Sequence, residues 1–424
     1  MMVGAALGWT TLNIAPAWAD ALLLVDAESG KVISERNATY PWYPASVTKL
    51  MTTYVTLKAV RDRRIELDSL FTVSSNAVAQ NPFKMGFKVG TQVTVDNALK
   101  MLLVHSPNDI AVVLAEGVSG SIEKFAEEMN AEARRLGMTQ TNYVNPNGLP
   151  DDGQITSARD LAILARALIL DFPEYDNYWH IASIRLGKRV YRNTNRLIDA
   201  YAGADGMKTG FICASGFNLV ATATRGGKRL IAVVLGAKSS TSRAVKAAQL
   251  FERGFGTAPP DWMAPSASTV DALEPISATP PDMHDDVCGN RRHRATKDVE
   301  EGGEAGTAPA AGTGSLGERR VVPRSSPRGA GLLTSGLAAG TAPVEVYTGP
   351  VRNGIASDAF VAPATKPLAA APRAGKRPSP LRHQHPLHVP HKEQRPQSRH
   401  ASYSGHPASG RSEFHGECRS DSNT

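Results

Sequence analysis

Three short motifs, far apart in the 424-residue chain, bring hydroxyl, amine and amide side chains: Ser46-Val47-Thr48-Lys49, Ser106-Pro107-Asn108 and Lys208-Thr209-Gly210. A serine acyl-transfer site needs such groups, namely a hydroxyl nucleophile, an amine as its base, and donors that hold a carbonyl substrate. Each motif alone occurs readily by chance. Their joint presence, in this order, predicts an enzyme that forms an acyl intermediate on serine.

The first motif pairs a nucleophile with a base. Apolar residues at helical spacing predict a helix over residues 46–60, and a spacing of three places Ser46 and Lys49 on one face of it. The Lys49 amine can take the Ser46 proton if burial or a nearby cation such as Lys208 lowers its pKa from about 10.4. The helix N-terminus also presents the Ser46 N–H to a developing oxyanion. The plainer interpretation is an exposed Ser and Lys on a surface helix.

The second motif is expected in a loop between two helices. Helical spacing begins after a cap at Asp96, and Pro107 interrupts it. In that loop the Ser106 hydroxyl can relay protons and the Asn108 amide can hold a substrate carbonyl. By itself the motif fits a simple capping turn equally well.

The third motif is expected on a strand. Lys208 and Thr209 place a cation and a hydroxyl at the edge of a sheet, and Gly210 leaves room for an extended peptide to lie antiparallel to it. An ordinary surface strand is the alternative for this motif alone.

Strand and helix patterns frame the motifs. Apolar runs predict a hairpin over residues 21–36, a strand over residues 207–212 and a second hairpin over residues 217–235. Amphipathic spacing predicts helices over residues 121–136, 157–170 and 242–255. With strands at both ends and helices between them, the chain is predicted to form an α+β fold with one antiparallel sheet of about five strands and a helical cluster.

The two ends of the chain differ from its middle. Residues 1–19 are mostly apolar and end in Ala-Trp-Ala, which predicts a secretory signal peptide and export. Residues 20–256 are predicted to form the catalytic domain. Residues 257–424 are rich in Pro, Ala, Gly and Ser, which predicts a low-complexity, disordered tail. Within this tail, residues 344–347 have a short strand pattern with no partner nearby in the sequence.

Composition excludes several classes of function. The net charge is +7 and the pI about 9.3, but no Lys/Arg block with interleaved aromatics is found, so a nucleic-acid partner is not expected. Cys213, Cys288 and Cys418 are too few and too scattered for a disulfide framework or a zinc site. Histidines after residue 379 fit a solvated tail better than a metal site. We expect no metal and no cofactor.

The motifs together resemble those of penicillin-binding proteins and class A β-lactamases. Tyr43-Pro44-Ala45-Ser46, Asn145-Pro146-Asn147-Gly148-Leu149 and Gly206-Met207-Lys208-Thr209-Gly210-Phe211 are similar, more narrowly, to the low-molecular-mass D-alanyl-D-alanine carboxypeptidases. The resemblance covers residues 20–256. It implies a β-lactamase/DD-peptidase-like fold.

The resemblance also implies a role for each matched residue. Ser46 is similar to the nucleophile of the family and Lys49 to its base, while Ser106 and Asn108 are similar to the pair that relays protons and positions substrate. Lys208, Thr209 and Arg243 are implied to bind the terminal carboxylate of the substrate. The N–H groups of Ser46 and of Phe211, which follows Gly210, are implied to bind the oxyanion. Pro107 and Phe211 depart from the residues usual at their positions.

The implied activity is removal of the terminal D-Ala from peptidoglycan stem peptides, in the periplasm or at the outer face of the inner membrane, with acylation by β-lactams. A class A-like β-lactamase is the first alternative, although no Glu-x-x-Leu-Asn element lies between the second and third motifs. A non-catalytic peptidoglycan-binding protein is the second. The sequence leaves open the balance of carboxypeptidase, endopeptidase and transpeptidase activity, the oligomeric state and membrane attachment.

Overall fold

The computed structural model describes residues 20–256, 268–289, 330–333 and 342–350. All of them belong to one compact unit. The predicted signal peptide, Cys418 and the late histidines lie outside the described residues.

One five-stranded antiparallel sheet carries the fold, as the sequence predicts. Its strands run in the order β2-β1-β9-β8-β7. Their bounds are β1 Ala21–Asp26, β2 Val32–Arg36, β7 Ala204–Ile212, β8 Gly216–Arg225 and β9 Lys228–Ala237. Both predicted hairpins are therefore present, and they join because β1 pairs with β9 along its whole length. The first strand of the described chain is thus an inner strand of a sheet that is completed some 200 residues later.

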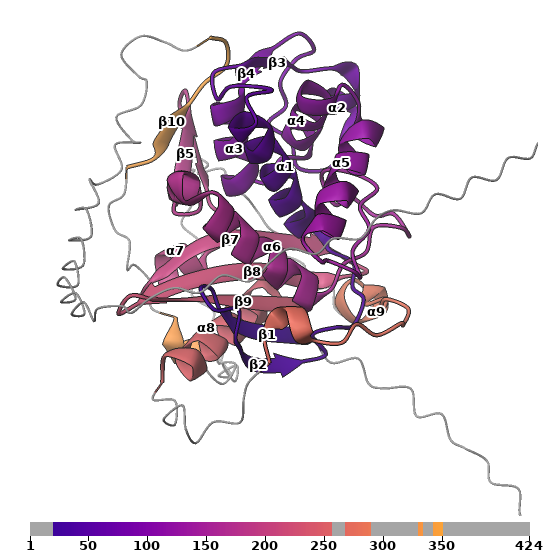
Figure 1. The fold of residues 1–424 in the computed structure, drawn as a ribbon. Helices are drawn as coiled ribbons and strands as arrows, with labels where there is room; N and C mark the ends of the chain where they lie inside the picture. The colour runs from indigo at the N-terminus through magenta and orange to yellow at the C-terminus, as the bar shows by residue number, and fades with distance from the viewer. Residues whose placement is uncertain (1–19, 257–267, 290–329, 334–341, 351–424) are drawn as a thin grey trace, which may run out of the picture. The chain divides into compact units, whose positions relative to one another are not determined.

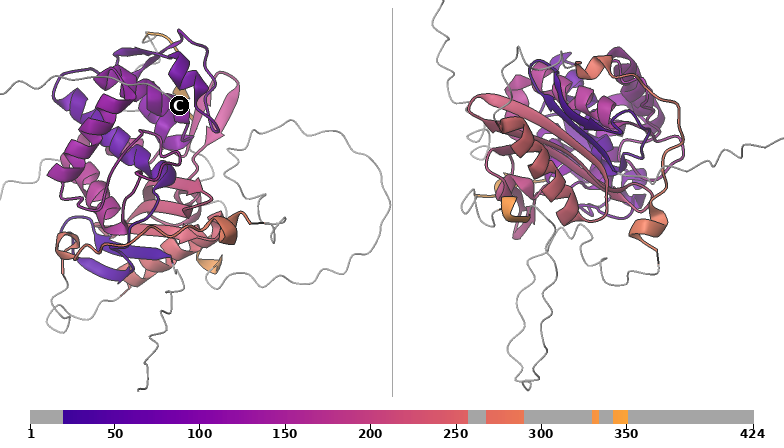
Figure 2. Two further views of the ribbon diagram at one scale, coloured as in Figure 1. Left: turned by 90° about the vertical axis from the view of Figure 1, so that its right-hand side faces the viewer. Right: turned by 90° about the horizontal axis from the view of Figure 1, so that it is seen from below.

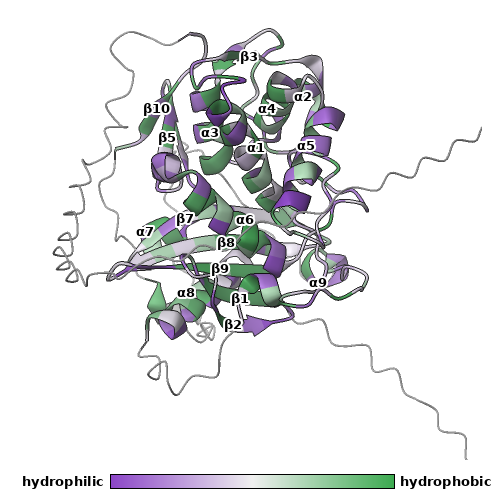
Figure 3. Ribbon diagram, in the orientation of Figure 1, coloured by the Kyte–Doolittle hydropathy of each residue, from purple (hydrophilic) through white to green (hydrophobic). Residues whose placement is uncertain are grey.

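Helices cover both faces of the sheet. The long helices α6 (Ala158–Asp171) and α8 (Ser240–Phe255) contact the same strands, β1, β8 and β9, from opposite sides (Figures 1 and 2). Hydrophobic residues accordingly run along β1 and β9, whereas β2 at the edge ends in the hydrophilic residues Ser-Glu-Arg (Figure 3). Burial of both faces explains why these strands read as continuous apolar runs rather than as alternating ones.

A helical cluster lies beyond α6 (Figure 1). It consists of α1 Lys49–Arg61, α2 Ser75–Ala79, α3 Val95–Val104, α4 Asn108–Ser119 and α5 Ile122–Arg135. The predicted cap at Asp96 is wrong. Thr94 caps α3 instead, because its hydroxyl accepts the Asn97 N–H at 3.2 Å, while Asp96 pairs with Lys100 one turn further along at 2.7 Å.

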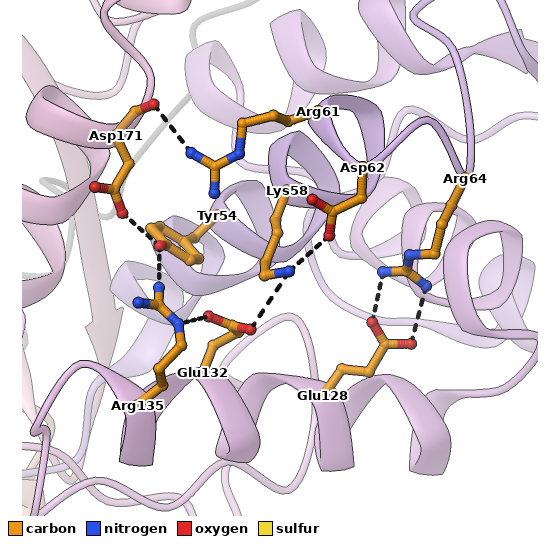
Figure 4. Close-up of polar contacts among 9 residues, drawn as sticks. All are labelled: Tyr54, Lys58, Arg61, Asp62, Arg64, Glu128, Glu132, Arg135 and Asp171. Carbon is orange, nitrogen blue, oxygen red and sulfur yellow. Dashed lines mark hydrogen bonds and ion pairs between the residues drawn. The ribbon is translucent and has the colours of Figure 1, made fainter.

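A network of polar contacts fixes α1 against α5 and α6 in this cluster (Figure 4). The Tyr54 hydroxyl of α1 donates to Asp171 of α6 at 2.6 Å and accepts a hydrogen bond from Arg135 of α5. Arg135 also pairs with Glu132 at 2.6 Å. Burial and the neighbouring Asp171 carboxylate raise the pKa of Tyr54, so the hydroxyl keeps its proton and remains a donor.

Short elements complete the fold, and one of them corrects a prediction. Their bounds are β3 Leu70–Thr72, β4 Gln92–Thr94, η2 Pro173–Tyr178, β5 Ser183–Leu186, β6 Arg189–Arg192, α7 Leu197–Ala200, η7 Ala330–Leu332 and β10 Val344–Val346. β3 pairs with β4, and β5 with β6. The predicted disorder is wrong at β10, which finds its partner far away in the sequence: it adds to β5 as a parallel strand, and Glu345 pairs with Arg185 at 3.2 Å.

Residues 268–289, which we call the C-terminal strap, also contradict the predicted disorder from residue 257 onward. The strap contains η4 (Val270–Ala272) and α9 (His284–Val287). It runs from the β1–β2 turn, where the Val270 N–H bonds Gly30, to the β7–β8 turn, where the Met283 N–H bonds Ala214. Its apolar anchors are buried but widely spaced, so average composition does not reveal them.

A disulfide joins Cys288 of the strap to Cys213 in the β7–β8 turn. The scatter of cysteines along the chain concealed this pairing, because its partners lie 75 residues apart.

We predict that Cys288→Ser lowers the free energy of unfolding by about 2–5 kcal/mol, because the bond removes chain entropy from the unfolded state. Denaturant unfolding measures the loss. The double variant with Cys213→Ser should lose no more than the single one, and a reducing agent should destabilise the wild type but neither variant. A wild type whose stability is indifferent to reduction would contradict the prediction.

Candidate active site

Ser46 lies in a single 3-10 turn, η1 (Ala45–Thr48), that leads into α1. The α-helix therefore begins at Lys49, later than the sequence predicts, but the expected pairing is present. The Lys49 Nζ donates to the Ser46 Oγ at 2.9 Å. Since Lys49 is fully buried and Ser46 is partly exposed, the hydroxyl is the member of the pair that a substrate can reach.

The Lys49 amine has two further acceptors. The Asn108 side-chain oxygen lies 2.8 Å from Nζ, and the Asn147 main-chain oxygen lies 2.8 Å from it on another side. A buried amine must have its N–H groups bonded, since leaving them unpaired costs several kcal/mol. The three acceptors match the three N–H groups of an ammonium.

The turn over residues 145–148 holds the Asn147 oxygen in place. The Gly148 N–H bonds the Asn145 side chain at 2.8 Å, and the Thr52 hydroxyl of α1 bonds the Pro146 oxygen at 2.6 Å. Gly148 has φ +82°, and a Cβ there would lie 1.9 Å from the Ala45 oxygen. Only glycine allows this turn to pack so closely beneath η1.

Ser106 lies between α3 and α4 in a conformation that non-glycine residues rarely adopt. Its φ is +64°, and its buried hydroxyl has no hydrogen-bond partner in the structure. Buried hydroxyl groups usually have a partner, and left-handed residues concentrate at functional sites. The Ser106 hydroxyl is therefore available to a bound molecule.

The segment over residues 82–86 fixes the start of α4. The Asn108 side-chain N–H bonds the Pro82 oxygen at 2.9 Å, which directs its oxygen at Lys49. The next residue, Asp109, accepts hydrogen bonds from the N–H groups of Met85 and Gly86 at 3.1 and 2.9 Å. Burial raises the pKa of Asp109, and these N–H groups oppose that rise. The Asp109 carboxylate thus holds residues 82–86 against the start of α4.

The third motif lies on β7, as predicted, and passes directly beside η1. A Cβ on Gly210 would lie 2.8 Å from the Ser46 nitrogen. Lys208 is fully buried, and its Nζ donates to the Thr209 oxygen at 3.0 Å. The Thr209 hydroxyl donates to the Thr194 hydroxyl at 2.8 Å, which fixes its orientation.

Phe211 and Arg243 lie at the margin of this arrangement. The Phe211 ring is partly exposed and packs on Phe217 with 4.3 Å between ring centroids. Arg243, on α8, is buried beside the same Phe217 ring and donates to the Asn218 main-chain oxygen at 3.2 Å. Lys49 thus bonds both Ser46 and Asn108, while Arg243 is connected to the site through β8.

Sequence reasoning missed several residues that shape the site. Asn147 contributes a main-chain oxygen, which any residue type could supply, so only its turn sequence marks it. Asp109 directly follows the second motif, and Thr194 lies in a stretch with no regular pattern. Asn218 carries the clearest missed signal, because it is an amide within an apolar strand.

Comparisons with known proteins identify relatives of this chain. A family model described as D-alanyl-D-alanine carboxypeptidase matches residues 11–239. The carboxypeptidase DacC of Escherichia coli is 41% identical over 244 residues, which are 56% of this chain and 61% of that protein. DacA of Haemophilus influenzae is 36% identical over 242 residues, 56% of this chain and 62% of that protein. The chain spans about three fifths of the length of these relatives.

Solved structures show the same fold. Penicillin-binding protein 6B from Escherichia coli has a TM-score of 0.54 and 37% identity, covering 56% of this chain and 77% of that one. The predicted DD-peptidase-like fold is therefore confirmed. Since the family model matches more than half of its length, the chain belongs to the D-alanyl-D-alanine carboxypeptidase family.

Proposed function

We propose that this protein is a serine-type D-alanyl-D-alanine carboxypeptidase that removes the terminal D-Ala from peptidoglycan stem peptides. The observation that carries the proposal is the contact between the Lys49 Nζ and the Ser46 Oγ at 2.9 Å, with Asn108 and Asn147 around the same amine. β-Lactams, whose strained amide resembles the scissile bond, acylate the same serine in this proposal.

The fixed acceptors around Lys49 direct its chemistry. A neutral amine has two N–H groups and one lone pair. When Asn108 and Asn147 accept the two N–H groups, the lone pair faces the Ser46 hydroxyl. Lys49 then takes the Ser46 proton as Oγ bonds to the carbonyl carbon between the two D-Ala residues.

Other groups of the site stabilise the tetrahedral intermediate and assist its collapse. The N–H groups of Ser46 and Phe211 bind the oxyanion of this intermediate. The unpartnered Ser106 hydroxyl gives its proton to the nitrogen of the departing D-Ala and takes in exchange the proton that Lys49 received from Ser46. Lys208 and Thr209 bind the substrate's terminal carboxylate. Water then hydrolyses the ester on Ser46 and regenerates the enzyme.

The contacts of Arg243 define its part in this proposal. Its guanidinium is packed beside the Phe217 ring and bonded to the Asn218 oxygen, so its position is fixed relative to β8. In this proposal the positive charge of Arg243 attracts the substrate carboxylate, and its side chain supports β8.

Two alternative functions make different demands. A class A-like β-lactamase needs a carboxylate that activates water for rapid release of the drug, and the chain has no Glu-x-x-Leu-Asn element. Fast multiple turnover of penicillin would favour it. A non-catalytic binder of peptidoglycan has no use for a buried lysine against a serine hydroxyl.

Export to the periplasm is part of the proposal. The predicted signal peptide supports it, and so does the disulfide between Cys213 and Cys288, because disulfides persist in oxidising compartments. Among the described residues, none of the helices has the length and apolar character needed to span a membrane.

We predict that a fluorescent penicillin labels the purified protein and that Ser46→Ala abolishes both this labelling and release of D-Ala from a D-Ala-D-Ala peptide. Ser29→Ala is the matched control, since Ser29 is exposed and its hydroxyl bonds locally, donating to Asp26 and accepting from the Lys31 N–H. Equal labelling of the Ser46→Ala variant would refute the proposal.

Gly210→Ala is predicted to slow acylation at least about tenfold, because the new methyl group displaces the Ser46 N–H from the oxyanion position. Stopped-flow labelling measures the rate. Gly331→Ala, where a Cβ meets nothing within 4 Å, should react as the wild type does. An unchanged rate in Gly210→Ala would exclude the Ser46 N–H as an oxyanion donor.

A further inference from the structure

Asn218 is a fully buried amide in an apolar stretch of β8. On one side it completes an irregular pairing with β9, where Leu235 and Gly236 together lie opposite this one residue. Gly236 has φ +81°, and its N–H donates to the Asn218 Oδ1 at 3.0 Å. The side chain therefore replaces a ladder hydrogen bond at a β-bulge, which fixes its own orientation.

The other end of the same amide holds the chain just before the nucleophile. The Asn218 Nδ2 donates to the Tyr43 oxygen at 2.9 Å and to the Pro44 oxygen at 3.1 Å. Ala45, which comes next in the chain, has φ +50°, so the backbone turns sharply into η1. Both N–H groups of Asn218 are thus directed at the segment that delivers Ser46.

The register of the sheet connects Asn218 with the third motif. Asn218 pairs with Gly210 on β7. Gly210 in turn lies against the same segment, since its Cβ would be 3.0 Å from the Pro44 oxygen and 2.8 Å from the Ser46 nitrogen. Two neighbouring strands therefore hold residues 44–46, one through an amide and one through backbone contact.

We propose that Asn218 is a positioning residue for catalysis: it sets the separation between the Ser46 N–H and the strand that carries the Phe211 N–H. This inference rests on the proposed function, in which those two groups bind the oxyanion. An oxyanion site requires both donors at hydrogen-bond distance from one oxygen. The bulge fixes the amide, the amide fixes the Tyr43 and Pro44 carbonyls, and these fix Ser46.

The test is Asn218→Asp, which keeps the size of the side chain and an oxygen for the Gly236 N–H. The substitution replaces the donating Nδ2 group with an oxygen, which then faces the carbonyl oxygens of Tyr43 and Pro44. The saturating rate of acylation by a fluorescent penicillin is expected to fall at least about tenfold, by analogy with the loss of an oxyanion donor. The half-saturating concentration should change less than about threefold, because Lys208 and Thr209 still bind the carboxylate.

Asn130→Asp is the matched control. Asn130 on α5 also uses both ends of its amide, bonding the Tyr143 oxygen and the Tyr143 N–H at 2.8 Å each. Its loss should lower stability without changing the acylation rate of the folded protein. The fraction of protein labelled at the end of the reaction separates misfolding from slow chemistry.

Asn218→Ser provides a second variant if the aspartate prevents folding. Its shorter hydroxyl cannot reach both carbonyls, so slower acylation is again expected. A folded Asn218 variant that is acylated as fast as the wild type, or one in which only the labelled fraction falls, would overturn the positioning role. Failure of the wild type to be labelled would instead refute the proposed function, so the two failures are distinguishable.

Discussion

The need to provide hydrogen-bond acceptors for one buried lysine amine organises the structure. Lys49 is shut off from water, and a buried charged group without partners costs several kcal/mol. One of its acceptors lies in the adjacent turn η1, and the other two come from distant parts of the chain, the start of α4 and the turn over residues 145–148. Each acceptor needs its own support, which explains Gly148 beneath η1 and the bond from Asn108 to residue 82. Further along α1, the Tyr54 hydroxyl bonds Asp171 of α6 and so ties the helix that carries Lys49 to its neighbour (Figure 4).

A second constraint is the close contact between η1 and the sheet. Lys49 and its hydrogen bonds fix Ser46 from the side of the helical cluster, while β7 and β8 fix it from the side of the sheet. The site therefore lies where η1 meets the sheet, and this contact consists of the backbone at Gly210 together with the Asn218 amide. Backbone contacts leave little freedom, which suits a site in which N–H groups must converge on one oxygen.

Local patterns predicted the hairpins, the main helices and the antiparallel sheet, because these depend on short-range spacing. The pairing of Ser46 with Lys49 followed from helix geometry alone. Contacts between distant segments were not predictable in this way. The Asn147 oxygen is independent of residue type, Asn218 acts through a bulge in the neighbouring strand, and Cys288 lies in a stretch whose composition resembles a linker. The cap of α3 was misassigned to Asp96 because Thr94 and Asp96 both suit a helix start.

The pairing of β1 with β9 has a consequence for how the protein is made. β1 can pair with β2 at once, but its other neighbour, β9, is absent until residues near 237 have been synthesised, and the strap can reach its disulfide partner only with residue 288. Contacts of such long sequence separation fold slowly. The five-stranded sheet therefore cannot close until more than half of the 424-residue chain has been synthesised.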